Sequence, residues 1–453
     1  MSSDFSQGKV WRRIVEQAIP LTLAQLVQLL YNIVDRIYIG HMPGAGSAAL
    51  TGIGLTFPVV TLITAFTNLF GMGGTPLFSI ARGAGETKHA RRIMGNVFSL
   101  LCGVSVLLTV FCFLLRRPIM FLFGASEASF VYADAYLRIY LLGTPFTMLA
   151  TGMNGFINAQ GYPRIGMLTT VIGAALNLVL DPLFIFVLDM GVAGAALATV
   201  LSQAVSCFWV LRFLTGKKTL LRIERKSMIP DISIIRQVLS LGAAGFFMQG
   251  TNFLVQVACN TTLQTFGGDL YVGVMTVLNS VRSVLELPVY GLTSGAQPVM
   301  GFNYGAKLYS RVRQAIRFTA LCGTAYNVAA WVCILLFPQA IMRVFTSDAP
   351  LLAAGPQALH IYFFGFFFMS FQFSGQTVFQ ALGFARHTVF FSLLRKAVIV
   401  VPLALLLPRL GFGVNGVFLA EPVSNALGGL ACFTTMVFTV YRPLMRKADE
   451  PRA

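Results

Sequence analysis

Two aspartates lie inside long apolar stretches of this sequence. Tyr31 precedes Asp35 by four residues, and Asn177 precedes Asp181 by the same interval. Residues four apart share one face of a helix, so each pair presents an oxygen-bearing polar surface. An ionisable side chain within a membrane-spanning helix is costly and is a functional candidate by default. The chemistry that fits is reversible binding of a proton or of a small cation such as Na⁺.

Further oxygen ligands are available near these aspartates. Pro182 follows Asp181 and should loosen the local helix, which frees backbone carbonyls that could serve an ion. Asn154 and Thr199, in two other apolar stretches, could add side-chain oxygens. The plainer alternative, that these polar residues only hold helices together by hydrogen bonds, stays open.

The chain matches itself without gaps when it is shifted by 222 residues. Matched positions include Pro76 with Pro298, Arg91 with Arg313, Tyr140 with Tyr362, Gly161 with Gly383, and Gly191 with Gly413. An ungapped match over this distance indicates two copies of one structural unit. In a chain this apolar, duplicated halves are typical of transporters.

The acidic cluster is absent from the second copy. The positions equivalent to Tyr31, Asp35, Asn177 and Asp181 are Phe253, Val257, Ile399 and Leu403. A structural requirement of the fold should appear in both copies. The asymmetry therefore favours a functional role for the first set.

The second copy has polar residues of its own, which could form a second polar site. Arg282 and Glu286 are four residues apart and should pair, because a lone charge in a bilayer is costly. Asn252 and Gln256 lie on a neutral polar stripe, and Glu421 occupies the repeat position of Thr199. A structural ion pair explains Arg282 and Glu286 as well as a substrate site does.

The elements that must position these residues are membrane helices. Hydrophobic residues make up 56% of the chain and charged residues 11%, which excludes an ordinary soluble domain. Apolar runs long enough to cross a bilayer, about 20 residues each, recur throughout. Twelve spans are predicted, at residues 14–40, 50–78, 94–115, 133–159, 165–188, 192–215, 236–262, 271–299, 316–338, 357–382, 388–408 and 413–440.

The distribution of basic residues predicts the orientation. A net charge of +17 on a soluble surface would suggest nucleic-acid binding, but here most Lys and Arg, with Arg395 and Lys396 among them, fall on one side. The positive-inside rule then places both termini in the cytoplasm. The expected location is the plasma (inner) membrane. Six spans per copy is an even number, so both copies insert alike and the pseudo-two-fold axis runs along the membrane normal.

The predicted organisation is an N-terminal six-helix lobe at residues 1–215, a basic cytoplasmic linker at 216–235 and a C-terminal six-helix lobe at 236–453. The seven Cys fall within predicted spans without paired spacing. They are interpreted as small apolar packing residues rather than as disulfides or metal ligands. The four His are scattered, so no metal cluster or catalytic triad can be assembled. Neither enzyme activity nor a cofactor is expected.

Several segments resemble multidrug and toxic compound extrusion (MATE) transporters, in particular the branch of bacterial multidrug exporters. The resemblance spans essentially the whole chain, and its motifs occur in the order of the family's helices. The segments are Tyr31-Asn32-Ile33-Val34-Asp35, Asn177-Leu178-Val179-Leu180-Asp181-Pro182, Gly191-Val192-Ala193-Gly194-Ala195-Ala196, Gln297-Pro298 and Asn303-Tyr304-Gly305-Ala306.

The resemblance implies two six-helix lobes around a central cleft that opens alternately to either side. It implies export of drugs and organic cations in exchange for H⁺ or Na⁺. The family's cation site maps onto Asp35, Asn177, Asp181 and Thr199, which could hold Na⁺, with Tyr31 and Asn154 assisting. Some members carry a helix-seven glutamate where this chain has Asn252, which argues against a second cation site of that kind.

Two other functions stay open at this point. A flippase for a lipid-linked sugar would need a strongly cationic cavity, whereas only one intramembrane Arg is expected in the core. A passive channel would give no reason for a one-sided acidic cluster. The expected partners are small-molecule drugs and the lipid bilayer, with no nucleic acid, and the expected state is a monomer.

Overall fold

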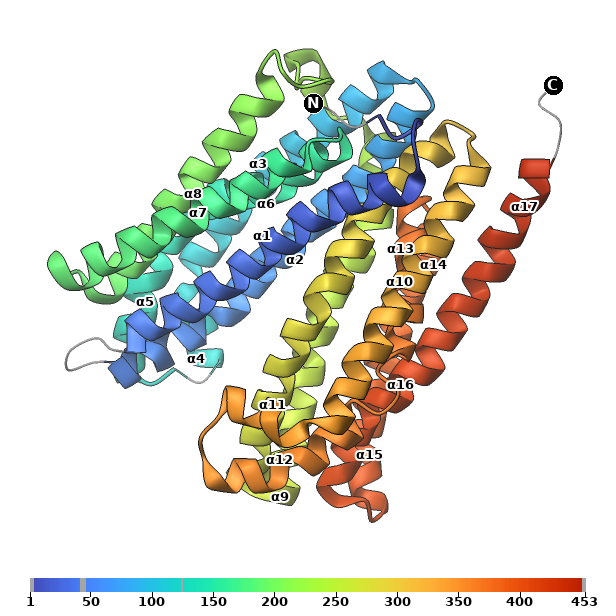
Figure 1. Cartoon of the computed structure of the whole chain (residues 1–453). Helices are drawn as coiled ribbons and strands as arrows, with labels where there is room; N and C mark the ends of the chain where they lie inside the picture. Colours follow the sequence, from blue (N-terminus) through green and yellow to red (C-terminus); the bar gives the residue numbers. More distant parts are fainter. Residues whose placement is uncertain (1–3, 41–45, 124, 450–453) are drawn as a thin grey trace. The chain divides into compact units, whose positions relative to one another are not determined.

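The computed structural model describes residues 4–40, 46–123 and 125–449, and all their regular elements are helices (Figure 1). The predicted all-α architecture is confirmed. The first half contains α1 Val10–Gly40, α2 Gly46–Gly83, α3 Thr87–Leu114, α4 Arg116–Leu122, α5 Glu127–Leu142, α6 Thr144–Ala159, α7 Pro163–Pro182, the π-helix η1 Leu183–Val187, and α8 Gly191–Thr215.

A short 3₁₀-helix, η2 Arg225–Met228, leads into the second half. That half contains α9 Ile232–Gly305, α10 Tyr309–Leu336, α11 Pro338–Phe345, α12 Ala349–Tyr362, α13 Phe368–Ala381, α14 Ala385–Leu393, the π-helix η3 Leu394–Val400, α15 Val401–Leu406, the 3₁₀-helix η4 Leu407–Leu410, α16 Gly413–Met436, the π-helix η5 Val437–Tyr441, and α17 Arg442–Asp449.

Nine helices of the described residues are long and apolar enough to cross a membrane. One of them, α9, contains two of the predicted spans, because Gly268 breaks it with a φ of 66°. Two other predicted spans are each divided between shorter helices, α5 with α6 and α12 with α13. Gly365, with a φ of 63°, separates the second of these pairs. These divisions reconcile the nine long helices with the twelve predicted spans.

The 222-residue repeat is present in the backbone. Gly161 and Gly383, which are 222 residues apart, have φ angles of 87° and 80°, and Gly191 and Gly413 have 55° and 53°. Helix starts recur at the same interval, from Thr87, Arg116, Glu127, Pro163 and Gly191 to Tyr309, Pro338, Ala349, Ala385 and Gly413. Equivalent turns and helix starts confirm that the chain contains two copies of one structural unit.

The helices pack into two compact units. The first consists mainly of Ile19–Gly242, and the second of Phe5–Ala18 with the described residues from Ala243 onward. These units are defined by packing rather than by duplication. The lobe boundaries at residues 215 and 236 therefore stay predictions.

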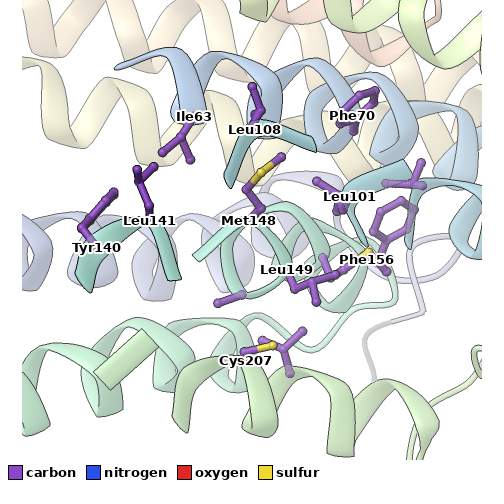
Figure 2. Packing of buried hydrophobic residues seen from close by; sticks show 14 of the residues in the cluster. Ile63, Phe70, Leu101, Leu108, Tyr140, Leu141, Met148, Leu149, Phe156 and Cys207 are labelled. Atoms are coloured by element: carbon purple, nitrogen blue, oxygen red, sulfur yellow. The ribbon is translucent and has the colours of Figure 1, made fainter. Parts of the chain in front are cut away.

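The core of the first unit is formed where α2, α3, α5, α6 and α8 meet (Figure 2). The rings of Phe78 and Phe156 contact edge to face, with centroids 5.3 Å apart. Leu101 and Met148 are completely buried in the same cluster. This packing holds α6 against α2 and α3, and α8, which carries polar side chains of the site, packs against α6 in turn.

The connecting segment after α8 is held against α3. Asn96 donates from Nδ2 to the carbonyl of Ile229 at 3.2 Å and accepts from the backbone N–H of Asp231 at 2.7 Å. The hydroxyl of Ser99 donates to the carbonyl of Met228 at 2.8 Å. The segment is therefore an ordered part of the first unit.

Candidate ion-binding site

Helices α7 and α8 pack against each other (Figure 1). Both helices carry buried polar side chains. Asn177 and Asp181 lie one turn apart on α7, and Asp181 is only 1% exposed. Thr199 on α8 accepts a hydrogen bond at Oγ1 from Asn177 Nδ2, at 3.3 Å. This contact joins two of the predicted ligands across the helix pair.

Helix α1 adds the second carboxylate. Asp35 and Asp181 are close enough to interact electrostatically. The phenol of Tyr31 interacts with both carboxylates and with Thr199. The structure thus brings together five of the predicted residues, here named the first-lobe cluster: Tyr31, Asp35, Asn177, Asp181 and Thr199.

The backbone next to the cluster departs from a regular α-helix. Pro182 ends α7, and the π-helix η1 follows at once. Proline has no N–H to donate to the preceding turn, and π-helical turns are frequent at functional sites. The predicted loosening of the helix beside Asp181 is confirmed, whereas a role for its carbonyls stays a prediction.

The cluster is rich in acceptors and poor in donors. Both carboxylate oxygens of Asp181 and Oδ1 of Asn177 are buried without a hydrogen-bond partner in the described part of the chain. A buried acceptor that lacks a donor is costly, and a second nearby carboxylate adds repulsion. Carboxylate, amide and hydroxyl oxygens are the ligands that hard cations prefer. This set of oxygen ligands therefore fits Na⁺ or a shared proton.

Asn154 lies elsewhere. Its Nδ2 donates to the carbonyl of Gly166 at 3.1 Å, and its Oδ1 accepts from the hydroxyl of Thr169 at 3.3 Å. Thr169 precedes Asp181 on α7 by about 18 Å, at 1.5 Å per residue. The structure places Asn154 with these two partners, and its expected contribution to ion binding stays a prediction.

Two tyrosines of α5 were missed in the sequence. Tyr136 interacts with Asp35 and Thr199, and its ring stacks on that of Tyr140 with centroids 5.7 Å apart. Both rings are buried. The only available signal was the repeat match of Tyr140 with Tyr362, which by itself indicates no site.

The second unit contains a buried group of charges around Glu421 on α16. Its Oε1 contacts Arg282 Nη1 of α9 at 2.6 Å, Arg395 Nη1 of η3 at 3.0 Å and Lys396 Nζ at 3.3 Å. Arg282 also pairs with Glu286, as predicted. We name the following set the second-lobe cluster: Arg282, Glu286, Tyr362, Arg395, Lys396, Glu421 and Asn425.

Two expectations are corrected by this cluster. Arg395 and Lys396 were expected on the cytoplasmic side, but they lie inside η3, and Lys396 is only 8% exposed. Burial is possible because Glu421 pairs with both. The expectation of a single core arginine was also wrong, because Arg395 contacts Glu421 together with Arg282. A window of sequence cannot reveal a carboxylate 25 residues away that compensates these charges.

The other two members of the predicted second-lobe site are not part of this cluster. Asn252 and Gln256 are exposed on α9. The structure gives neither a hydrogen bond to Arg282 or Glu286 among the residues it describes. The four residues are therefore not brought together as one site.

Comparisons with known proteins match this chain in both copies of the repeat. The family model MatE matches residues 20–183 and 245–406, one match in each copy of the repeat. A curated relative, "Multidrug export protein MepA" of Staphylococcus haemolyticus, is 24% identical over 438 residues, which cover 96% of this chain and 94% of the relative. The protein of the same name from Staphylococcus saprophyticus is 22% identical and covers 98% and 97%.

Solved structures show the same fold. The outward-facing conformation of a multidrug resistance MATE family transporter of the MOP superfamily superposes with a TM-score of 0.91. It is 24% identical, and the match covers 98% of this chain and all of that chain. The two chains share their helical architecture over nearly their whole length.

Proposed function

This chain belongs to the MatE family, and from that premise we propose that it is a secondary-active multidrug exporter. It expels organic, mainly cationic, compounds in exchange for H⁺ or Na⁺. Membership in the family, whose matched relatives are named multidrug export proteins, supports export of drugs. The single observation that carries ion exchange is the interaction of Asp35 with the buried Asp181, whose two carboxylate oxygens have no hydrogen-bond partner among the described residues.

The first-lobe cluster performs the exchange through charge. With both aspartates ionised, the carboxylates repel each other, and no donor in the described part of the chain bonds to either oxygen of Asp181. A proton on one carboxylate, or Na⁺ held by Asp35, Asn177, Asp181 and Thr199, relieves the repulsion. The ion-bound and ion-free clusters then favour different packings of α1, α7 and α8. Ion entry is thereby linked to release of the exported compound.

The membrane potential adds to the driving force when the exchange moves net positive charge inward. Each positive charge that moves inward gains roughly 2.3 kcal/mol per 100 mV. At about 1.4 kcal/mol per factor of ten, this sustains a drug gradient of about fifty-fold. Exchange of one ion for one monovalent organic cation moves no net charge and is driven by the H⁺ or Na⁺ concentration gradient alone, whereas exchange of two ions also uses the potential.

The orientation in the cell membrane follows from the basic ends of the helices. The last turn of α2 contains Arg82, and the first two turns of α3 contain Lys88, Arg91 and Arg92. The linker after α8 is also basic. This concentration persists after Arg395 and Lys396 are removed from the count. It supports cytoplasmic termini by the positive-inside rule.

The second-lobe cluster gives one reason to consider a flippase for a lipid-linked sugar, since buried cations can bind pyrophosphate. Here Glu421 and Glu286 compensate two of the three cations. A strongly cationic cavity would carry several unpaired charges. Drug export is therefore the better supported function.

Transport into vesicles separates these functions. Purified protein reconstituted in liposomes should move a fluorescent organic cation only when a pH or Na⁺ gradient is imposed. Flux without a gradient requirement would indicate a channel. Movement of a lipid-linked pyrophosphate, with no drug flux, would indicate a flippase and would overturn the proposal.

A further inference from the structure

The charges of the second-lobe cluster do not balance when all its groups are ionised. Arg282 and Arg395 remain protonated in proteins, and Glu286 and Glu421 offset them. Lys396 is then the surplus positive charge, with its ammonium 3.3 and 3.4 Å from the two oxygens of Glu421. It is also the only one of the three cations that can readily lose its proton. The cluster becomes neutral when Lys396 is neutral.

The groups that face Lys396 come from several elements. Glu421 lies directly against Lys396, and Arg282 and Arg395 contact the same carboxylate. The charged and titratable groups are Arg282, Glu286 and Cys259 of α9, Tyr362 of α12, Arg395 of η3 and Glu421 of α16. The cluster contains two carboxylates and three basic side chains. It therefore has a net charge of one as long as Lys396 is protonated.

The position of the cluster in the repeat relates it to the proposed ion site. Glu421 is the repeat equivalent of Thr199, and Tyr362 is that of Tyr140. Tyr362 contacts Arg282 in the second unit, while Tyr140 stacks on the tyrosine that interacts with Asp35 in the first. The two copies thus use equivalent positions for clusters of opposite charge.

We propose that Lys396 is a second proton-binding site, which carries a proton in one part of the transport cycle and releases it in another. This inference rests on the proposed export of organic cations. The step is the loss of H⁺ from the ammonium to leave a neutral amine. The charged form raises the positive charge of the second-lobe cluster by one and disfavours an organic cation, whereas the neutral form admits it. Proton uptake at Lys396 then accompanies drug release.

The test is to count the protons released on binding. Tetraphenylphosphonium, a monovalent organic cation, is titrated into the purified full chain in nanodiscs by calorimetry, in buffers of different ionisation enthalpy. Unaltered protein is expected to release protons on binding. Lys396→Met should release fewer, by up to one proton per bound cation, and should keep its affinity at lower pH.

Lys396→Arg is the matched control, because it retains the ion pair but cannot lose its charge. A purely structural role predicts that Arg preserves the proton count, whereas our proposal predicts a reduced count and a weaker affinity at high pH. Glu286→Gln gives a second measurement if Lys396→Met does not fold. Removal of that carboxylate should move proton release from the cluster to lower pH.

The outcomes distinguish the two levels of inference. Binding that releases no proton in unaltered protein would overturn both the exchange of cations for protons and the role of Lys396. Normal proton release that is unchanged in Lys396→Met and Lys396→Arg would overturn the role of Lys396 alone.

Discussion

Asn177 and Thr199 are joined across α7 and α8 by a hydrogen bond of 3.3 Å from Nδ2 to Oγ1. The donor side of the amide is thereby engaged, and its Oδ1 is left buried without a hydrogen bond in the described structure. One turn further along α7, Asp181 presents two more such oxygens. The contact fixes the amide that completes an acceptor-lined site.

Thr199→Val should weaken binding of the coupling ion about tenfold. The substitution removes the acceptor of Asn177 and one oxygen ligand, at a cost of about 1–2 kcal/mol. Calorimetric titration of Na⁺ at several pH values measures the effect. Thr215→Val on the same helix is the matched control, because the hydroxyl of Thr215 bonds to the carbonyl of Leu211 near the other end of α8. Equal losses in the two variants would separate Thr199 from the ion site.

Asp35→Asn should abolish ion-driven efflux while the protein still folds and inserts. Asparagine has nearly the same shape but cannot lose and regain a charge. Drug-resistance assays in cells check activity, and membrane yield with thermal stability checks folding. Normal resistance in cells that express this variant would remove Asp35 from the exchange mechanism.

Asp181→Asn alone should cost nearly as much transport as the double change with Asp35→Asn. Groups that share one buried ion are non-additive, because the loss of one already disables the site. A double-mutant cycle on initial transport rates measures the interaction. If the single losses simply multiply, the two aspartates act independently, and Asp181 is then better explained as a helix-packing residue.

Asn252→Ala should change efflux only modestly. The side chain is exposed on α9 and carries no charge that an ion could neutralise. Na⁺ titration and transport rates of the variant provide the check. A collapse of Na⁺ binding would show that an ion binds in the second lobe instead of at Asp35 and Asp181.

Gly95→Ala should destabilise the protein by about 1–3 kcal/mol, as overpacking usually does. A methyl group at Gly95 would lie 2.2 Å from the backbone carbonyl oxygen of Ser227, in the segment held against α3. Gly103→Ala on the same helix is the control, since, apart from the adjoining backbone of α3 itself, no described atom lies within 4 Å of its added methyl. Thermal unfolding in detergent compares them. A similar Tm for both variants would mean that the segment can move aside at no cost.

The membrane spans, the repeat and the two candidate aspartates could be predicted from the sequence alone. Each depends on a property that is local or periodic in the chain. Apolar runs predict spans because burial in lipid depends on the side chains of one helix. Asp35 and Asp181 are conspicuous because a carboxylate in such a run is costly wherever its helix packs.

The tertiary structure decided which charges compensate each other. The sequence predicts a cytoplasmic position for Arg395 and Lys396, whereas the structure pairs both with Glu421. Asn154 bonds to Gly166 and Thr169. Tyr136 of α5 interacts with Asp35 and Thr199 of the first-lobe cluster, although nothing in the sequence around it indicates this. Ion pairs and hydrogen bonds act over a few ångströms, so their partners depend on which helix faces meet. Residues from separate helices meet only when the chain has packed.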